Sequence, residues 1–155
     1  MAKKLALIAS KGTLDWAYPP FILASTAAAL DYEVQIFFTF YGLTLLKKDL
    51  SNLCVSPIGN PAMPMPVPMP NFVQMLPGME SMATMMMKQK IASKGVASID
   101  TLRCACVEAG VKLIACQMTV DLFDFKKSDF ILDIEYGGAA TFFEFAGESD
   151  VNLFI

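Results

Sequence analysis

Residues 110–123 read GVKLIACQMTVDLF and hold the clearest β-strand signal of the chain. Residues 111–115 are a mostly apolar run that follows a glycine, which is typical of a strand buried on both faces of a sheet. Cys116 ends this run, and the chain then turns, with a short helix expected from about Thr119. A helical pattern precedes the strand, so the segment indicates an α/β protein.

The alternation of strands and helices extends along the whole chain. We expect further strands at residues 5–9, 33–40, 131–136 and 151–155, and helices at residues 42–48, 98–109 and 138–146. The first helix is expected to begin near Pro20 and to end near Asp31, because Pro19 and Pro20 would disrupt a helix interior. The predicted fold is a single three-layer α/β/α domain over residues 1–155, with a mostly parallel sheet of about five strands.

An insertion of different composition interrupts this pattern at about residues 57–92. Six prolines fall between Pro57 and Pro70, and nine of the eleven methionines fall between Met63 and Met87. The proline-rich half should be an extended arm, and residues 72–91 should be helical. The methionines at three- and four-residue spacing should form a stripe covered by a second subunit, with these four at the contact: Met75, Met79, Met82 and Met86. Core packing, a membrane-facing surface and a copper(I) site are the alternatives.

The composition excludes several classes of function. The 155 residues are 55% hydrophobic and only 17% charged, which favours self-association. A net charge of −3 without a basic run argues against nucleic-acid binding. Histidine is absent, so Ser-His and Cys-His catalysis and the usual zinc sites are excluded, and no metal or organic cofactor is expected.

The sequence also bears on where the protein is located. No uncharged run free of prolines reaches the roughly 20 residues that a membrane-spanning helix needs. We therefore expect no transmembrane segment, while peripheral membrane contact stays open. Without a secretory signal, the four cysteines are expected to be free thiols in a reducing cytoplasm.

Cys116 is the main candidate for chemistry. In an open parallel sheet, functional groups collect at the carboxyl ends of the strands, and a helix N-terminus there favours a thiolate. The alternative is that Cys116 is a buried packing residue. Cys104 and Cys106 point about 200° apart on a helix, so at most one could approach Cys116. The alternative for Cys104 and Cys106 is that both are small packing residues of the helix. Cys54 is expected to be structural or incidental.

Lys11, Gly12 and Thr13 are a second candidate group, since they follow the first strand. If the strand at residues 111–115 lay beside the first strand, this group could hold an anion next to Cys116. An ordinary surface turn is the alternative.

Several segments together resemble one known family. They are SKGTLD (10–15), VQIFFTFYGLTLL (34–46), LPGMESMATMMMK (76–88), GVKLIACQMTVD (110–121), GGAATFFEFA (137–146) and the terminal VNLFI. The chain resembles the DsrE/DsrF-like family of sulfur-relay proteins. This resemblance implies a homo-oligomeric α/β/α protein whose Cys116, by its match to ACQM, carries sulfane sulfur as a persulfide or thiosulfonate. A second family cysteine would fall at Cys104 or Cys106.

Three functional hypotheses follow. The leading one is a sulfur carrier or sulfurtransferase that passes sulfur from a donor to the thiol of a partner protein. The second is a non-catalytic interaction or membrane-surface protein that works through its proline- and methionine-rich arm. The third is a redox sensor that pairs Cys106 with Cys116.

Overall fold

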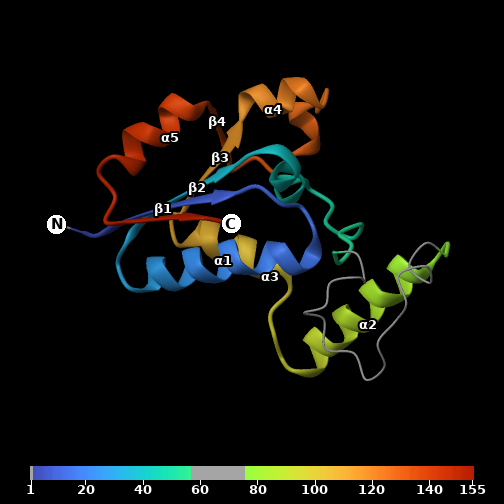
Figure 1. Cartoon of the computed structure of the whole chain (residues 1–155). Helices are drawn as coiled ribbons and strands as arrows, with labels where there is room; N and C mark the ends of the chain where they lie inside the picture. Colours follow the sequence, from blue (N-terminus) through green and yellow to red (C-terminus); the bar gives the residue numbers. More distant parts are fainter. Residues whose placement is uncertain (1, 57–75) are drawn as a thin grey trace.

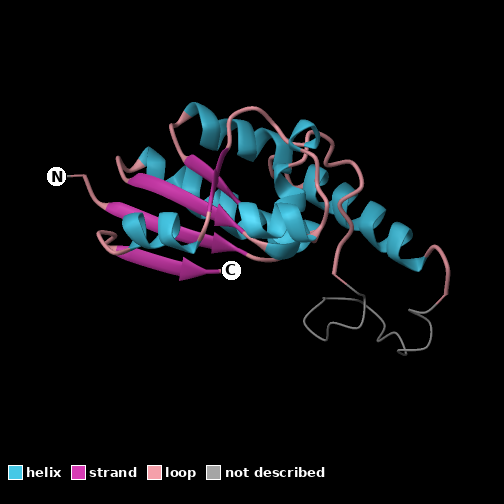
Figure 2. Cartoon of the chain, turned by 90° about the horizontal axis from the view of Figure 1, so that it is seen from above, coloured by secondary structure: helices cyan, strands magenta, loops and turns pink. Residues whose placement is uncertain are grey.

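The computed structural model describes residues 2–56 and 76–155. They contain a five-stranded sheet in the order β4-β3-β2-β1-β5, and all four strand pairs are parallel. The strands are β1 (Lys4–Ala9), β2 (Glu33–Phe38), β3 (Lys112–Cys116), β4 (Glu135–Gly137) and β5 (Val151–Phe154). Figure 2 shows the arrows of the larger strands pointing the same way. The predicted parallel α/β fold is confirmed.

Helices cover both faces of the sheet (Figure 1). On one face lie α1 (Leu14–Ala29) and α3 (Ile99–Glu108), and on the other lie α4 (Gln117–Leu122) and α5 (Ala139–Ala146). Side chains alternate between the two faces along each strand. Leu113 and Ala115 of β3 therefore join the large core under α1 and α3, whereas Ile114 and Cys116 join a smaller cluster under α5.

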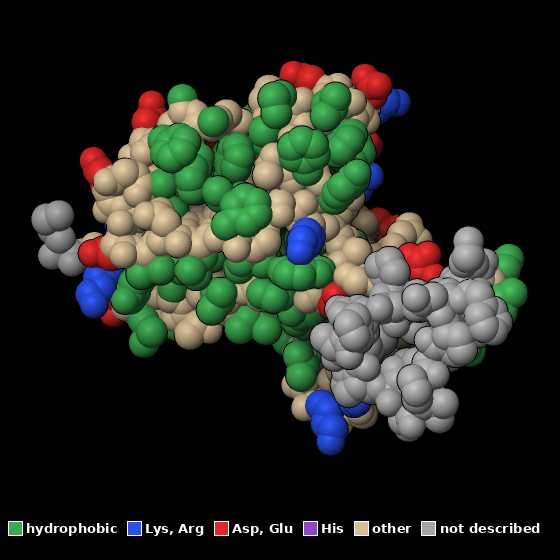
Figure 3. All heavy atoms as spheres, viewed as in Figure 1, with side chains coloured by type: hydrophobic (Ala, Val, Ile, Leu, Met, Phe, Trp, Pro, Cys, Tyr) green, Lys and Arg blue, Asp and Glu red, His purple; other side chains and the backbone are tan. Residues whose placement is uncertain are grey.

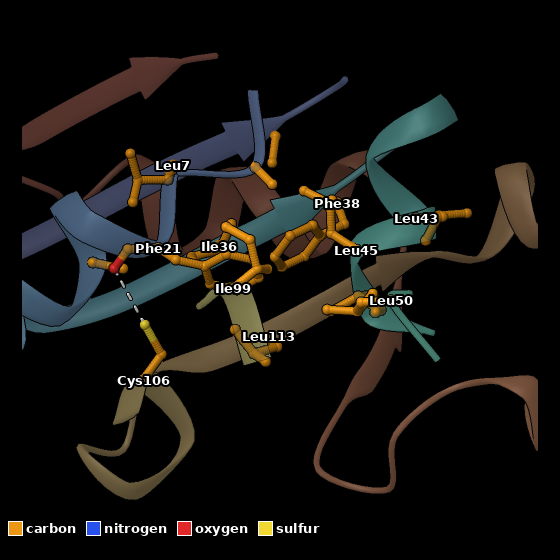
Figure 4. Close-up of a cluster of buried hydrophobic side chains, with 14 of the residues drawn as sticks. Leu7, Phe21, Ile36, Phe38, Leu43, Leu45, Leu50, Ile99, Cys106 and Leu113 are labelled. Atoms are coloured by element: carbon orange, nitrogen blue, oxygen red, sulfur yellow. Dashed lines mark hydrogen bonds between the residues drawn. The ribbon is translucent and has the colours of Figure 1, made fainter. Parts of the chain in front are cut away.

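The larger core is built from side chains of β1, β2 and β3 against α1 and α3 (Figure 4). Phe21 of α1 and Phe38 of β2 are fully buried, with ring centroids 5.9 Å apart. Leu7, Ile36 and Leu113 pack around them from the three central strands. This face has the deeper hydrophobic layer of the two.

The prediction that α1 begins near Pro20 is wrong. The helix begins at Leu14 and contains Pro19 and Pro20 in its interior. Both prolines remove a hydrogen bond, but Leu14 and Ala17 are buried in the core, and Leu14 donates its backbone N–H to Cys54 O. Burial of the first turn outweighs the local preference, and the expected long loop before Pro20 is absent.

Most other predicted elements are close to those observed, but the strand expected at residues 131–136 forms only at Glu135–Gly137, and in the described residues the helix expected at 72–91 begins only at Met79. A 3-10 helix, η1 (Phe40–Leu46), follows β2, and a shorter one, η3 (Lys127–Asp129), lies before β4. Ser98 caps α3 through a 3.2 Å hydrogen bond from Thr101 N. Within the described ranges, no helix is long and apolar enough to span a membrane.

The insertion is described only in its second half. There α2 (Met79–Ser93) lies to one side of the three layers (Figure 1). The predicted extended arm falls on residues 57–75 and so lies outside the described residues.

Candidate functional site

Cys116 is the last residue of β3 and the N-cap of α4. The helix therefore begins directly after the cysteine, two residues earlier than predicted. The side chain is buried, with 5% of its surface exposed. The strand end thus places one thiol where a helix starts, beneath the layer formed by α4 and α5.

Apolar side chains surround this thiol. Cys116 packs in one cluster with Ile114, Phe37 of β2 and Phe142 of α5. The rings of Phe37 and Phe142 lie 5.7 Å apart. Phe142 is the bulky residue of α5 that closes this cluster from the helix side, so the thiol lies in a small apolar environment.

The strand β4, which pairs with β3 on its outer side, has no side chain opposite Cys116. Gly137 of β4 is its register partner, so both residues face the same side of the sheet. A Cβ atom at Gly137 would lie 2.9 Å from Thr141 of α5, closer than packed side chains allow. Glycine at this position lets α5 approach the sheet beside the thiol.

Polar side chains lie where α4 meets the connection that follows β2. Thr119, one turn into α4, is fully buried, and its Oγ1 atom lies 3.3 Å from Thr39 Oγ1. It also accepts a 3.3 Å hydrogen bond from the backbone N–H of Phe40. Phe40 has a φ of 47°, a left-handed conformation that is unfavourable for a bulky residue. The hydrogen bond from Phe40 thus ties this strained connection after β2 to α4.

The structure does not bring the other candidate cysteines to Cys116. Cys106 is fully buried in the large core on the opposite face of the sheet, and its Sγ atom donates to Phe21 O at 3.4 Å (Figure 4). Burial raises the pKa of the Cys106 thiol to about 11. Cys104, on the same helix, is exposed. A disulfide between Cys106 and Cys116 would have to cross the sheet, so the redox-sensor hypothesis has no geometric support.

The premise for an anion site beside Cys116 is wrong. β3 lies beside β2, and β1 is one strand further away. Lys11, Gly12 and Thr13 instead line a separate pocket of about 490 Å³ with Trp16 and Tyr41.

Local contacts already engage this second group. The ammonium group of Lys11 lies 3.3 Å from the ring centroid of Trp16, and Thr13 Oγ1 is hydrogen bonded to Ser56 Oγ at 3.1 Å. A Cβ atom at Gly12 would overlap Tyr41 O, so this glycine permits two loops to touch. Burial alone would raise the pKa of Asp15, but hydrogen bonds from Ser56 lower it, so a carboxylate lies near the same pocket.

The remaining candidates are dispersed. Met82 is exposed and Met79 is half-buried on α2, Met86 is 61% exposed, and Met75 lies outside the described residues. Cys54 is half-buried near the start of α1. In the described part of the chain, no three Cys, Asp or Glu side chains are grouped closely enough to hold a metal ion.

Sequence reasoning missed three residues at this strand end: Phe142, which packs in the cluster of Cys116, and Thr119 and Thr39, which contact each other. Thr119 follows the cysteine by three residues, and the start of the helix at Cys116 would have placed it one turn away. Phe142 and Thr39 approach from other elements, so only the tertiary fold reveals them.

These features define a class of protein: a three-layer α/β protein with a parallel sheet and one thiol at a strand end, alone on its face in the described residues. The chain belongs to the DsrE/DsrF/DrsH-like family, whose profile matches residues 1–154.

Individual relatives cover the chain almost completely. It is 68% identical over 157 residues to the sulfur carrier protein DsrE2 of Allochromatium vinosum, covering 99% of this chain and 98% of that protein. It is 33% identical over 162 residues to the uncharacterized protein YrkE of Bacillus subtilis, covering 99% and 97%. The crystal structure of the ychN protein from E. coli has the same fold, with a TM-score of 0.57 at 10% identity over 99% of both chains.

Proposed function

We propose that this protein is a sulfur carrier in which Cys116 holds the transferred sulfur atom as a persulfide. The observation that carries the proposal is the coincidence of two findings. The chain is 68% identical, over nearly its full length, to a protein named as a sulfur carrier. It also holds a single thiol at a strand end, on the face covered by the short helices α4 and α5.

The chemistry consists of two thiol exchanges. The Cys116 thiolate attacks the outer sulfur of a donor persulfide, which forms a bond between two sulfur atoms and releases the donor as its thiolate. A partner's thiolate then attacks the outer sulfur on Cys116, and the Cys116 thiolate leaves. Each step breaks one sulfur–sulfur bond and forms another, so neither needs an external oxidant or reductant.

The surroundings of Cys116 suit a carrier that acts with one thiol. A persulfide beside a second thiol would collapse to a disulfide and release the sulfur as sulfide. In the described residues the α5 face holds no other cysteine, and Cys106 lies across the sheet. The apolar cluster of Phe37 and Phe142 would also slow the access of water and small thiols to the loaded sulfur.

Loading requires Cys116 to become accessible, because 5% exposure leaves no path for a partner's thiol. A displacement of α5 would open such a path. This helix has eight residues, follows Gly138, and buries only Phe142 and Ala146. We therefore assign α5 as the cover that a donor or acceptor protein displaces.

Intact-mass measurement after treatment with glutathione persulfide tests the proposal. The native protein should gain the mass of one sulfur atom, and Cys116→Ser should gain none. Cys104→Ser is the matched control, because that thiol is exposed on α3, and it should load as the wild type does. Loading that persists in Cys116→Ser would refute the proposal.

The carrier role implies a donor and an acceptor protein, and we place the exchange in the cytoplasm. A reducing compartment keeps thiols free, and all four cysteines are unpaired in the structure.

We further propose that the protein is a homo-oligomer with α2 at one subunit contact. α2 buries Ala83 and Thr84 toward the body of the protein, where Val55 N donates to Thr84 Oγ1 at 3.1 Å. Met82, Met85 and Met86 remain exposed. Methionine suits a contact surface of this kind because its side chain is flexible and polarizable.

The same exposed methionines are the observation that favours the alternative, a membrane-surface protein. Alkylation of the folded protein and binding to lipid vesicles separate the two functions. A carrier should react slowly but measurably at Cys116 and should not require lipid. A Cys116 that never reacts, in a protein that binds vesicles through α2, would favour the alternative.

A further inference from the structure

We propose that the outer edge of β5 is a second self-association surface, on which β5 of another copy pairs antiparallel and extends the sheet. This contact is distinct from the α2 methionines and does not depend on the sulfur carrier function. It follows from the unpaired backbone of β5, its apolar sequence and its register with β1.

β5 is an open sheet edge. It pairs with β1 on one side, and within the described part of the chain no strand pairs with its other side. Figure 2 shows the strand that ends at the C-terminus as the outermost arrow of the sheet. All four of its residues are exposed.

The hydrogen bonds to β1 show which groups remain free. Ile155 donates its backbone N–H to Ile8 O and accepts a hydrogen bond from Ser10 N. Because successive residues of a strand direct their backbone groups to opposite sides, Val151 and Leu153 also face β1, whereas Asn152 and Phe154 direct their N–H and C=O groups outward. Two residues therefore offer two donors and two acceptors to another strand.

These free groups are self-complementary. If a two-fold axis passes beside Leu153, Asn152 of one copy faces Phe154 of the other, and the two copies exchange their outward donors and acceptors. Val151 then faces Ile155, so no two like charges lie opposite each other. A second copy of the chain thus satisfies the edge without any repulsive pair.

The side chains along this edge are apolar. Val151 and Leu153 are in register with Leu5 and Leu7, so they lie on the α1 face of the sheet. α1 leaves Ile22 and Leu23 exposed, and Phe154, on the other face of β5, is 73% exposed. Figure 3 shows hydrophobic side chains gathered over α1 and along the line of β5 on this side of the molecule.

The two edge strands of the sheet, β4 and β5, differ in how well they are protected against pairing with another strand. Proteins protect sheet edges with short strands, charged residues or proline. The opposite edge, β4, has only three residues and carries Glu135. β5 reads VNLF, with neither a charge nor a proline. Only β5 lacks protection.

The area available is appropriate for a subunit contact. At about 200 Å² for a whole aromatic side chain, Phe154 alone leaves roughly 150 Å² in water. With Val151, Leu153, Ile22 and Leu23 beside it, the face supplies a substantial part of the ~800 Å² that each partner buries in a stable interface.

Sedimentation of matched lysine variants tests the contact. Leu153→Lys places a charge on the edge, and Leu132→Lys removes an equally large side chain from a loop where Leu132 is 90% exposed. Leu153→Lys should weaken the association by roughly 100-fold or more, as two buried charges would oppose each other across the contact. Leu132→Lys should assemble as the wild type does. A Leu153→Lys protein that assembles normally would refute the proposal.

A measurement on the wild type keeps the test independent of how the variant folds. In the assembled protein, the amides of Asn152 and Phe154 should exchange roughly 100-fold more slowly than after dilution to the monomer. Equal exchange at both concentrations, or a wild type that is monomeric at micromolar concentration, would overturn the inference. Met82→Asp tests the α2 contact separately, and sulfur loading of Leu153→Lys tests the carrier function separately.

Discussion

The two faces of the sheet each bury a cysteine, but they bury it differently. Cys106 lies in a core that α1, α3 and three strands build together, where it donates a hydrogen bond to Phe21 O. Cys116 lies under one short helix at the end of a strand. Burial alone therefore does not distinguish a packing cysteine from a functional one; the amount of structure that must move to expose the thiol does.

The largest difference between the faces should appear in stability. Phe21→Ala removes a fully buried ring from the large core, and we expect it to lower the free energy of unfolding by about 4 kcal/mol. Chemical denaturation with a far-ultraviolet circular dichroism readout measures this change. If Phe21→Ala lowered the free energy of unfolding less than Phe142→Ala on the α5 face does, the two faces would not differ as described.

The α5 face should lose less stability and gain reactivity. Phe142→Ala should cost about 2 to 3 kcal/mol, because the smaller cluster near solvent can collapse into the space. It should also speed alkylation of Cys116 about tenfold or more, since opening of α5 then breaks fewer contacts. Phe143→Ala is the control, because Phe143 is 69% exposed. Unchanged reactivity of Cys116 would show that α5 does not cover it.

Part of the pH dependence of stability should come from Cys106, on the face of the sheet covered by α1 and α3. The pKa of Cys106 is raised from an ordinary value of 9.0 to about 11 in the folded protein. Between these values the unfolded chain loses the proton first, so stability should fall as the pH rises from 9 toward 11. Cys106→Ala should reduce this dependence, as followed by urea denaturation at several pH values, and Cys116→Ser serves for comparison. An identical dependence in Cys106→Ala would contradict the assignment.

The smallest expected effect concerns how the helices begin. α3 has a side-chain cap at Ser98, whereas Gly138 before α5 offers none. Ser98→Ala should lower the free energy of unfolding by about 1 kcal/mol without changing Cys116 alkylation. A thermal melt and the alkylation rate check both statements. A change in Cys116 reactivity would mean that the two faces are coupled.

Much of the fold was predictable because its signals are local. The apolar run that ends at Cys116, the Ser98 cap and the VNLFI strand all depend on residues close together in the sequence. Pro19 and Pro20 misled the prediction of α1, because the burial of Leu14 and Ala17 that keeps the helix intact is a tertiary effect.

The site was predictable only in part for the same reason. Alternation along β3 places Ile114 and Cys116 on one face, but the sequence does not say which helix covers that face. The position of β3 beside β2 could not be derived either, and it removed the proposed anion group from Cys116. Phe142 joins the cluster of Cys116 from α5, and Thr39 contacts Thr119 from the end of β2.

The central claim is that Cys116 alone carries sulfur. The most direct test uses a chain that keeps only this thiol, with Cys54→Ser, Cys104→Ser and Cys106→Ala combined. After treatment with glutathione persulfide, peptide mapping should find one added sulfur on Cys116, and a small acceptor thiol should remove it. No loading of this folded variant, or loading that needs a second cysteine, would contradict the account.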